Sequence, residues 1–279
     1  MRAQAETWAG AGVNEDAVFL GVSSGVLADG ATGLGEASVA GWGSAAAWFS
    51  HRLSRGVVGA IEGADLHPAD ALASAVASIR EEYRGLGGDP EDGPSGSICV
   101  FRIDGDSLDL CLLGDCTSVV VERSGTAHVL RDEAVPRMDG EVVAQMVRLA
   151  GERGVPVSEA AESVSHLLTA NRARRNTPDG YWIADLSGAG VPHARSHRFA
   201  WSAVSHLLFV TDGLAAAVDP LRLIDDYPAL ASEVRAGRAH DLIQRIRERE
   251  GGDADLTKYP RLKVSDDAGY LSVWHAHEH

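Results

Sequence analysis

The stretch SICVFRIDGDSLDLCLLGD, residues 97–115, contains the pattern that decides the fold of this chain. Two apolar runs, residues 97–103 and 107–113, flank the dipeptide Asp104-Gly105. This dipeptide between two strand-like runs is a typical signal of a tight β-hairpin. Strand-like runs follow at residues 117–122 and 127–130. We therefore expect an antiparallel β-meander over residues 97–130.

Further strands and helices are expected on both sides of this meander. Two short strands are predicted within residues 17–28, and later strands near residues 181–184, 197–201, 206–211 and 270–275. Apolar residues at helical spacing predict helices over residues 36–61, 68–85 and 228–249, with helical character in residues 139–170. Blocks of strands separated by helices favour the α+β class, with two packed sheets and helices outside. We expect one domain over residues 1–279, with a helical insertion around residues 139–170.

Carboxylates stand at the ends of several predicted strands, far apart in the sequence. Asp29 follows Val26-Leu27-Ala28, Asp115 follows the run that ends at Leu113, and Asp212 follows residues 207–210. Each Asp-Gly pair taken alone is also a common turn signal, so the prediction depends on the whole set. Strand ends can meet at one edge of a sheet, where such acids would repel one another. A hard divalent cation turns that repulsion into binding, because Mg²⁺ and Mn²⁺ prefer oxygen ligands.

The order of these segments resembles that of the metal-dependent protein phosphatases, the 2C-type serine/threonine phosphatases. The similar segments are Asn14-Glu15-Asp16, Asp29-Gly30-Ala31-Thr32-Gly33, Pro94-Ser95-Gly96-Ser97-Ile98, Leu113-Gly114-Asp115-Cys116-Thr117, Val210-Thr211-Asp212-Gly213-Leu214 and Ser265-Asp266-Asp267-Ala268. The resemblance spans nearly the whole chain and looks closest to a compact bacterial branch. It implies a four-layer α-β-β-α sandwich of two mainly antiparallel sheets.

The resemblance also implies a site with two Mg²⁺ or Mn²⁺ ions. Asp29 would be shared between them. Asp212 and Asp266 would complete the protein ligands of one ion. Glu15 and the Gly30 carbonyl would complete the protein ligands of the other. The remaining acids would be Asp115, which with Asp212 is a candidate for a third ion, and Asp16, which would orient a water. In two-metal sites a water activated by the ions attacks phosphorus directly. The catalytic set implied is Asp16, Asp29 and Asp212, and the substrate class is phosphoserine or phosphothreonine in proteins.

Two positions depart from the family's pattern. Many members carry a His directly after the first Asp-Gly, where it is a candidate general acid, and this chain has Ala31. Many also carry an Arg shortly before the Glu-Asp pair, and here Arg2 is the only arginine upstream. The run that contains Arg172, Arg174 and Arg175 is a candidate replacement, because guanidinium groups suit phosphate. A solvated helix end is the alternative for this run.

These departures leave a second function open, namely a catalytically weak or inactive phosphatase-like domain that binds phosphoprotein or metal as a regulator. A phosphatase for a small phosphorylated metabolite is a third possibility that no residue of the sequence distinguishes. The expected partner is a phosphorylated protein.

The composition narrows the classes of partner. The chain has 25 basic and 40 acidic residues and a net charge of −15, which argues against nucleic acid and anionic membrane surfaces. No run approaches the roughly 18 apolar residues of a membrane span, and no leader pattern precedes the first strand. We therefore expect a cytoplasmic protein. Cys99, Cys111 and Cys116 lack metal-ligand spacing, and reduced thiols are expected.

Overall fold

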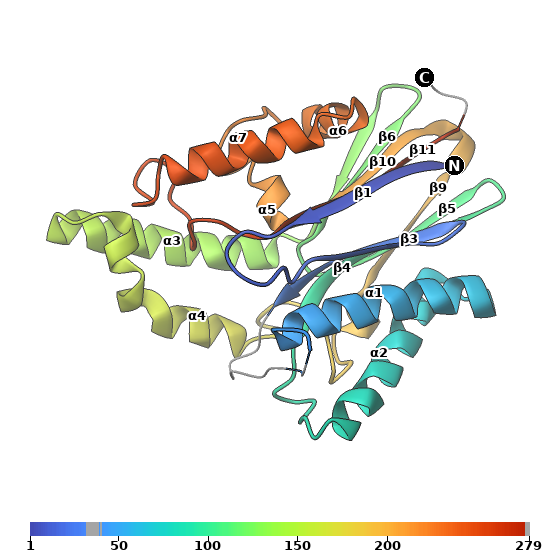
Figure 1. The fold of residues 1–279 in the computed structure, drawn as a ribbon, viewed down its shortest axis with the longest axis horizontal. Coiled ribbons are helices and arrows are strands. Elements are labelled where there is room, and N and C mark those ends of the chain that lie inside the picture. The colour runs from blue at the N-terminus through green and yellow to red at the C-terminus, as the bar shows by residue number, and fades with distance from the viewer. Residues whose placement is uncertain (32–38, 40, 277–279) are drawn as a thin grey trace.

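The computed structural model of the chain describes residues 1–31, 39 and 41–276, and their strands form two antiparallel sheets packed face to face (Figure 1). The first sheet contains, in spatial order, β1 (Arg2–Trp8), β11 (Ala268–Trp274), β10 (Val204–Val210), β6 (Thr117–Glu122) and β7 (Ala127–Leu130). The second contains β2 (Ala17–Leu20), β3 (Ser24–Ala31), β4 (Ser95–Asp104), β5 (Ser107–Leu113) and β9 (Arg195–Ala200). The two-residue strand β8 (Ala184–Asp185) pairs with β4.

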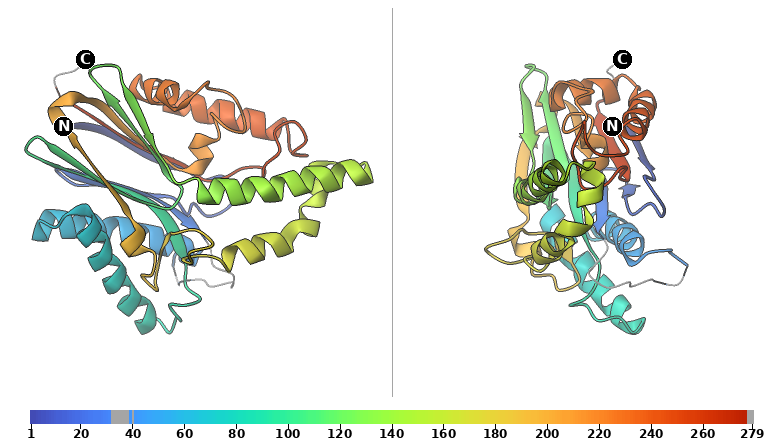
Figure 2. Two further views of the ribbon diagram at one scale, coloured as in Figure 1. Left: turned by 180° about the vertical axis from the view of Figure 1, so that it is seen from behind. Right: turned by 90° about the vertical axis from the view of Figure 1, so that its left-hand side faces the viewer.

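Helices cover the outer faces of both sheets, which gives the α-β-β-α order of layers that was expected (Figure 1). The second sheet carries α1 (Ala45–Ala64) and α2 (Pro68–Gly85), and the first carries α5 (Asp212–Ala215), α6 (Tyr227–Arg235) and α7 (Ala239–Gly251). Seen from behind, the β6–β7 hairpin and β9 lie at the edge of the sandwich opposite to β1 and β2 (Figure 2).

A helical arm projects from one end of the sandwich in both figures. It contains α3 (Ala134–Arg153), the 3₁₀ turns Val157–Ala160 and Glu162–Val164, and α4 (Ser165–Arg172). The arm has its own small apolar cluster, which includes Val142, Met146 and Val164. A third 3₁₀ turn, Val191–His193, precedes β9, and a fourth, Trp201–Ala203, joins β9 to β10.

The main core lies between the two sheets. Leu27, Phe101, Phe209 and Leu271 are fully buried there, and the rings of Phe101 and Phe209 lie 6.2 Å apart across the sheets. Burial of one such large apolar side chain contributes about 1.5–3 kcal/mol. The core holds the two sheets in fixed register, so the strand ends at the arm side of the sandwich have fixed relative positions.

The four strands predicted over residues 97–130 exist, but the prediction that they form one meander is wrong. They form two hairpins, β4–β5 in the second sheet and β6–β7 in the first, because the chain crosses between the sheets after Leu113, where Gly114 adopts φ 90°. β5, β6 and β7 start and end where the sequence predicted. The β4–β5 hairpin also forms, but its turn residues are Gly105, at φ 56°, and Asp106, because Asp104 still pairs with Ser107 as the last residue of β4. The predicted helix over residues 228–249 is wrong as one element. It is divided into α6 and α7, because Gly237 adopts φ 77° between them and a left-handed residue ends a helix.

Other bounds also differ from the predictions. β1 was not predicted, because Ala3 and Ala5 are its inward residues and so short a side chain gives a weak apolar signal. The strand expected at residues 181–184 is reduced to β8. The helix expected from residue 36 begins at Ala45, where the Ser44 hydroxyl accepts a 3.0 Å hydrogen bond from the Ala47 amide. Residues 36–38 and 40 of that expected helix lie outside the described residues.

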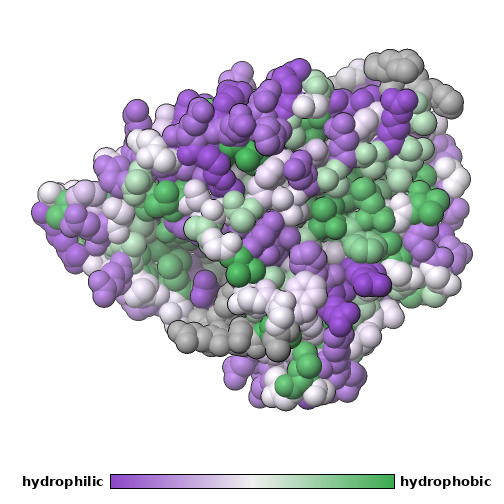
Figure 3. Space-filling view, viewed as in Figure 1, coloured by the Kyte–Doolittle hydropathy of each residue, from purple (hydrophilic) through white to green (hydrophobic). Residues whose placement is uncertain are grey.

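The surface is mainly polar over the helices, whereas apolar side chains gather over the strands on the face that Figure 3 shows. Phe19 and Leu20 of the edge strand β2 are among the exposed apolar residues. Within the described part of the chain, no helix is long and apolar enough to cross a membrane.

Candidate functional site

The predicted acids meet at one end of the sandwich, next to the helical arm. β10 runs antiparallel to both β6 and β11, so the end of β10 lies beside the starts of those strands. Asp212 follows β10 after Thr211 and begins α5, Asp115 precedes β6, and Asp266 precedes β11. Asp29 lies at the equivalent end of the second sheet, paired with Ser97 of β4. The strand order therefore explains why residues so distant in sequence come together.

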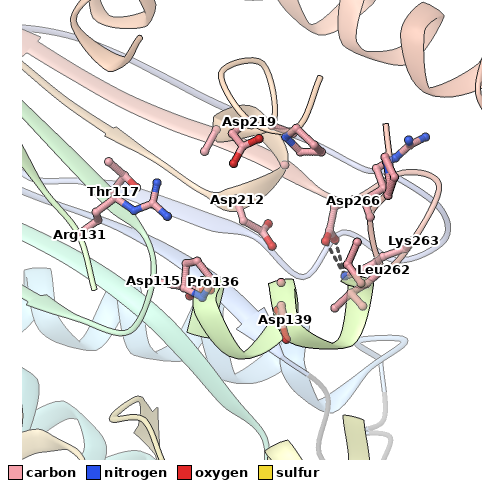
Figure 4. Close-up of a pocket in the computed structure, with 18 of the residues that line it drawn as sticks. Asp115, Thr117, Arg131, Pro136, Asp139, Asp212, Asp219, Leu262, Lys263 and Asp266 are labelled. Carbon is pink, nitrogen blue, oxygen red and sulfur yellow. Dashed lines mark hydrogen bonds and ion pairs between the residues drawn. The ribbon is translucent and has the colours of Figure 1, made fainter. Parts of the chain in front are cut away.

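Two adjoining cavities, of about 510 and 340 Å³, open at this end. The larger is lined by Glu15, Asp29, Gly30, Asp115, Asp212 and Asp266 among others. Both cavities share Asp115, Asp139, Asp212, Lys263 and Asp266. In Figure 4, Asp212 and Asp266 point into one space, and Asp139 faces it from α3.

Glu15 and Gly30 are held together by the backbone. The Gly30 amide donates a 3.1 Å hydrogen bond to the Glu15 carbonyl, which also accepts a 2.6 Å bond from the Ser50 hydroxyl of α1. A Cβ at Gly30 would lie 2.6 Å from that carbonyl oxygen, so only glycine fits. The Glu15 amide in turn donates a 2.7 Å bond to Asp267 Oδ2, while Asp267 Oδ1 accepts a 2.8 Å bond from the Gly10 amide.

Asp115 is positioned by Ser97. The Ser97 hydroxyl donates to Asp115 Oδ1, and the Asp115 amide donates a 3.1 Å hydrogen bond to Ser97 Oγ. Gly114 makes the approach possible, since it adopts φ 90° and a Cβ there would lie 2.3 Å from Ser97 Oγ. Ser95, Gly96 and Ser97 all belong to β4, so Ser97 holds Asp115 from a position within the sheet.

Asp16 is the most enclosed acid of the set, with 1% exposure. Its Oδ2 accepts a 2.8 Å hydrogen bond from the Thr211 hydroxyl, whereas Oδ1 has no hydrogen-bond partner in the described part of the chain. A buried oxygen without a donor is costly, and a cation or an ordered water would relieve it.

The carboxylates destabilise one another's charged forms. Burial, followed by the charges of neighbouring acids, raises the pKa of Asp29 well above its usual value. The pKa of Asp212 is raised to about 8, first by desolvation and then by Asp266 and Asp115, although the residue is exposed to the cavity. Burial likewise raises the pKa values of Asp16 and Asp115. The cluster thus holds more negative charge than its surroundings neutralise.

The donor set fits a hard divalent cation in its chemistry. All the candidate ligands are carboxylate or carbonyl oxygens, and no His or Cys lies among them. Among residues 1–31, 39 and 41–276, however, no three His, Cys, Asp or Glu side chains form a ready-made cage around one ion. Few direct protein ligands per ion suit Mg²⁺ and Mn²⁺, which retain several waters, better than they suit zinc.

The three arginines of the basic run occupy different environments. Arg172, at the end of α4, lines the larger cavity. Arg174 instead donates to the Asp179 carbonyl, and Arg175 pairs with Asp185 at 3.3 Å and with backbone carbonyls of residues 91 and 93. Arg174 and Arg175 thus bind elsewhere, and only Arg172 of this run faces the acids.

Two charged residues of the site were missed in the sequence. Asp139 belongs to an Asp-Gly pair that resembled a turn but lies inside α3, and burial with the charge of Asp115 raises its pKa to about 6. Lys263 lies three residues before Asp266, and its Nζ is 2.6 Å from the Asp266 carboxylate. The only available signal was the proximity of Lys263 to Asp266 in the sequence.

Ala31 ends β3 at the rim of the larger cavity, so the position that holds His in many phosphatases lies at the site without a titratable group. Thr32 and Gly33, which complete the first Asp-Gly segment, lie outside the described residues. Cys116 is buried, and a hydrogen bond with Cys99 together with burial raises the pKa of its thiol well above the usual value. All three cysteines are described, and each is free and buried.

Solved structures with the same fold are bacterial serine/threonine phosphatases. The structure of PstP/Ppp of Mycobacterium tuberculosis matches with a TM-score of 0.55 and 19% identity, over 98% of this chain and 99% of that chain. Stp1 of Staphylococcus aureus matches with a TM-score of 0.56 and 15% identity, over 98% and 94%. The catalytic domain of PstP in complex with two manganese ions matches with a TM-score of 0.53 and 18% identity, over 97% and 96%. No protein-family model and no curated protein sequence matches the chain. The likeness therefore establishes the fold alone.

Proposed function

We propose that this protein is a phosphatase that hydrolyses phosphoserine or phosphothreonine in proteins and depends on Mg²⁺ or Mn²⁺. The observation that carries the proposal is the convergence of Asp29, Asp212 and Asp266 in one cavity, with raised pKa values for Asp29 and Asp212. Such a cluster is stable only with compensating cations or protons. The fold shared with serine/threonine phosphatases supports the same class of substrate.

Each acid has a proposed role. Asp29 would be a ligand shared by two ions. Asp212 and Asp266 would complete the protein ligands of one ion, and Glu15 and the Gly30 carbonyl those of the other. Asp115 would contribute to a third ion with Asp212, and Asp16 would orient a water. Bound divalent ions supply an activated water and neutralise charge on the phosphoryl oxygens. The Ser97 and Thr211 hydroxyls would hold Asp115 and Asp16 in place for these roles.

Arg172 is the proposed arginine for the substrate phosphate, since Arg174 and Arg175 bond elsewhere. Arg172→Gln is expected to raise the Michaelis constant for a phosphothreonine peptide. Arg174→Gln is the matched control, because that side chain reaches the Asp179 carbonyl and does not line either cavity. An equal Michaelis constant in wild type and Arg172→Gln would remove Arg172 from the phosphate site.

A regulator that binds phosphoprotein or metal with little turnover is the second candidate. It is favoured by Ala31, which cannot protonate a leaving group, and by Lys263, which already pairs with one proposed metal ligand.

Metal binding and turnover, measured separately, distinguish the two functions. Calorimetry with Mn²⁺ is expected to show binding that is lost or much weakened in Asp212→Asn. Asp104→Asn is the control, because it also changes an Asp-Gly pair but lies exposed at the end of β4, next to the β4–β5 turn. Hydrolysis of p-nitrophenyl phosphate and a phosphothreonine peptide should require Mn²⁺ and stop with EDTA. Mn²⁺ binding without hydrolysis of either substrate would favour the regulator, and unchanged Mn²⁺ binding in Asp212→Asn would exclude both metal-dependent functions.

A further inference from the structure

Lys263 places a positive charge directly at the acid cluster. Its Nζ lies 2.6 Å from both carboxylate oxygens of Asp266, and Figure 4 shows the two contacts. Lys263 lines both cavities together with Asp115 and Asp212. Its side chain nevertheless remains 64% exposed, and that of Asp266 is 27% exposed. The lysine therefore pairs with a proposed metal ligand, but no surrounding side chains enclose it in that position.

Two of the three arginines that line the cavities, Arg131 and Arg261, pair with residues outside the acid cluster. Arg131 donates a 2.5 Å hydrogen bond to the Tyr227 hydroxyl and pairs with Glu133. Arg261 pairs with Asp253 at 2.8 Å. Arg172 lies on α4, and its side chain is exposed. Lys263 differs from Arg131 and Arg261 because its partner, Asp266, belongs to the acid cluster.

The residue type suits a change of partner. The chain contains only two lysines, Lys258 and Lys263, against many arginines. An ammonium group is a compact charge on a flexible four-carbon stem, whereas a guanidinium prefers a fixed planar pairing with a carboxylate. Lys263 can therefore leave Asp266 and reach into the cavity with little rearrangement of the backbone.

The charges favour such a change of partner. The ammonium group lies 2.6 Å from both oxygens of Asp266, so a divalent cation that binds either oxygen would meet the positive charge of Lys263 at close range. A phosphate that enters the cavity brings two negative charges and lies beside carboxylates. The upstream Arg that would offset those charges in many 2C-type phosphatases is absent.

We propose that Lys263 has two alternating partners: Asp266 in the metal-free protein, and the substrate's phosphate group when divalent cations are bound. This inference rests on the proposed function. Lys263 is then both the internal counter-ion of the empty cluster and a phosphate-binding residue of the loaded one.

The proposal predicts effects of opposite sign on two ligands, which a purely structural lysine would not produce. Lys263→Met should bind Mn²⁺ about tenfold more tightly, because the competing cation is gone. The Mn²⁺-loaded variant should bind inorganic phosphate about tenfold more weakly, because a charged hydrogen bond is worth about that factor. Lys263→Arg, which keeps the charge, should retain phosphate binding. Lys258→Met is the control, because Lys258 is exposed and lines neither cavity.

A measurement without turnover tests the change of partner directly. Protein labelled with ¹⁵N at the lysine side chains gives signals from two amines only. Mg²⁺ should shift the Lys263 signal, and phosphate added afterwards should shift it again, with Lys258 unchanged.

Measuring the binding of Mn²⁺ and of phosphate separately distinguishes a wrong role for Lys263 from a wrong proposed function. Unchanged affinities for both Mn²⁺ and phosphate in Lys263→Met would overturn the inference while leaving the phosphatase function intact. Tighter Mn²⁺ binding with unchanged phosphate binding would also overturn it, since Lys263 would then be a counter-ion alone. Absence of Mn²⁺ binding in the wild type would overturn the proposed function, and with it the inference.

Discussion

Thr211 Oγ1 donates a 2.8 Å hydrogen bond to Asp16 Oδ2, which links the end of β10 to the residue that precedes β2. The two residues are 195 positions apart and adjoin strands of different sheets. The same Thr211 oxygen accepts a 2.7 Å bond from the Gly269 amide of β11. One hydroxyl thus fixes the position of a buried acid relative to both sheets.

We expect Thr211→Val to destabilise the metal-free protein by about 1–3 kcal/mol. The substitution keeps the volume, but it removes the donor of Asp16 and the acceptor of the Gly269 amide, and buried groups left without partners cost about that much. Urea unfolding with EDTA measures the change. Ser118→Ala is the control, because the Ser118 hydroxyl is buried without a hydrogen-bond partner. Its removal should therefore change the free energy of unfolding little. Equal stability of wild type and Thr211→Val would contradict this role.

Asp267 is expected to affect metal binding without being a proposed ligand. Its two carboxylate oxygens accept hydrogen bonds from the Gly10 and Glu15 amides, so it holds the segment that carries Glu15. Loss of a group that orients a ligand typically weakens metal binding by about 10–100-fold. Calorimetry of Asp267→Ala should therefore show weaker Mn²⁺ binding. Asp255→Ala, which changes an exposed turn away from the cavities, should bind Mn²⁺ like wild type. Normal Mn²⁺ affinity in Asp267→Ala would show that Glu15 is held by other contacts.

His206 should make stability depend on pH. It is buried in β10, contacts Ser272 Oγ at 2.8 Å, and has a pKa lowered to about 4 by burial and then by Arg235. The folded state therefore binds fewer protons than the unfolded state between about pH 6.5 and 4. Stability should fall as the pH drops through that window, by about 3 kcal/mol in total for this group.

The comparison with His206→Gln isolates this contribution, because the other titrating groups are common to both proteins. Urea unfolding at pH 7 and pH 4.5 should show a smaller loss for the variant than for wild type. Equal losses would mean that His206 becomes protonated in the folded state without cost.

Ala31 should limit catalysis on poor leaving groups. General acid catalysis typically contributes about 10²–10⁴-fold, and the position after Asp29-Gly30 offers no proton. We expect turnover of p-nitrophenyl phosphate, whose leaving group needs little protonation, to exceed turnover of a phosphoserine peptide by a wide margin. Ala31→His should narrow that margin. Equal wild-type turnover of both substrates, with chemistry rate-limiting, would show that another group donates the proton. Asp139, with a pKa of about 6 and a place on the cavity wall, would then be the first residue to test.

The sequence by itself determined the local elements and the identity of the acids. The apolar runs at residues 107–113, 117–122 and 127–130 were sufficient for the bounds of β5, β6 and β7, because strand propensity and hairpin chemistry are local properties. The acids at the strand ends could be named for the same reason, since each follows or precedes its own apolar run.

Only the tertiary structure decided which charges share the cavity with these acids. The pairing of β10 with β6 and β11 brings Asp212 beside Asp115 and Asp266, and the helical arm adds Asp139 and Arg172 while Arg174 and Arg175 bond elsewhere. The contact of Lys263 with Asp266 likewise depends on the path of the loop before β11. Strand order and loop path are set by packing between distant segments, which leaves no periodic signal in the sequence, whereas strands and turns are set by neighbours along the chain.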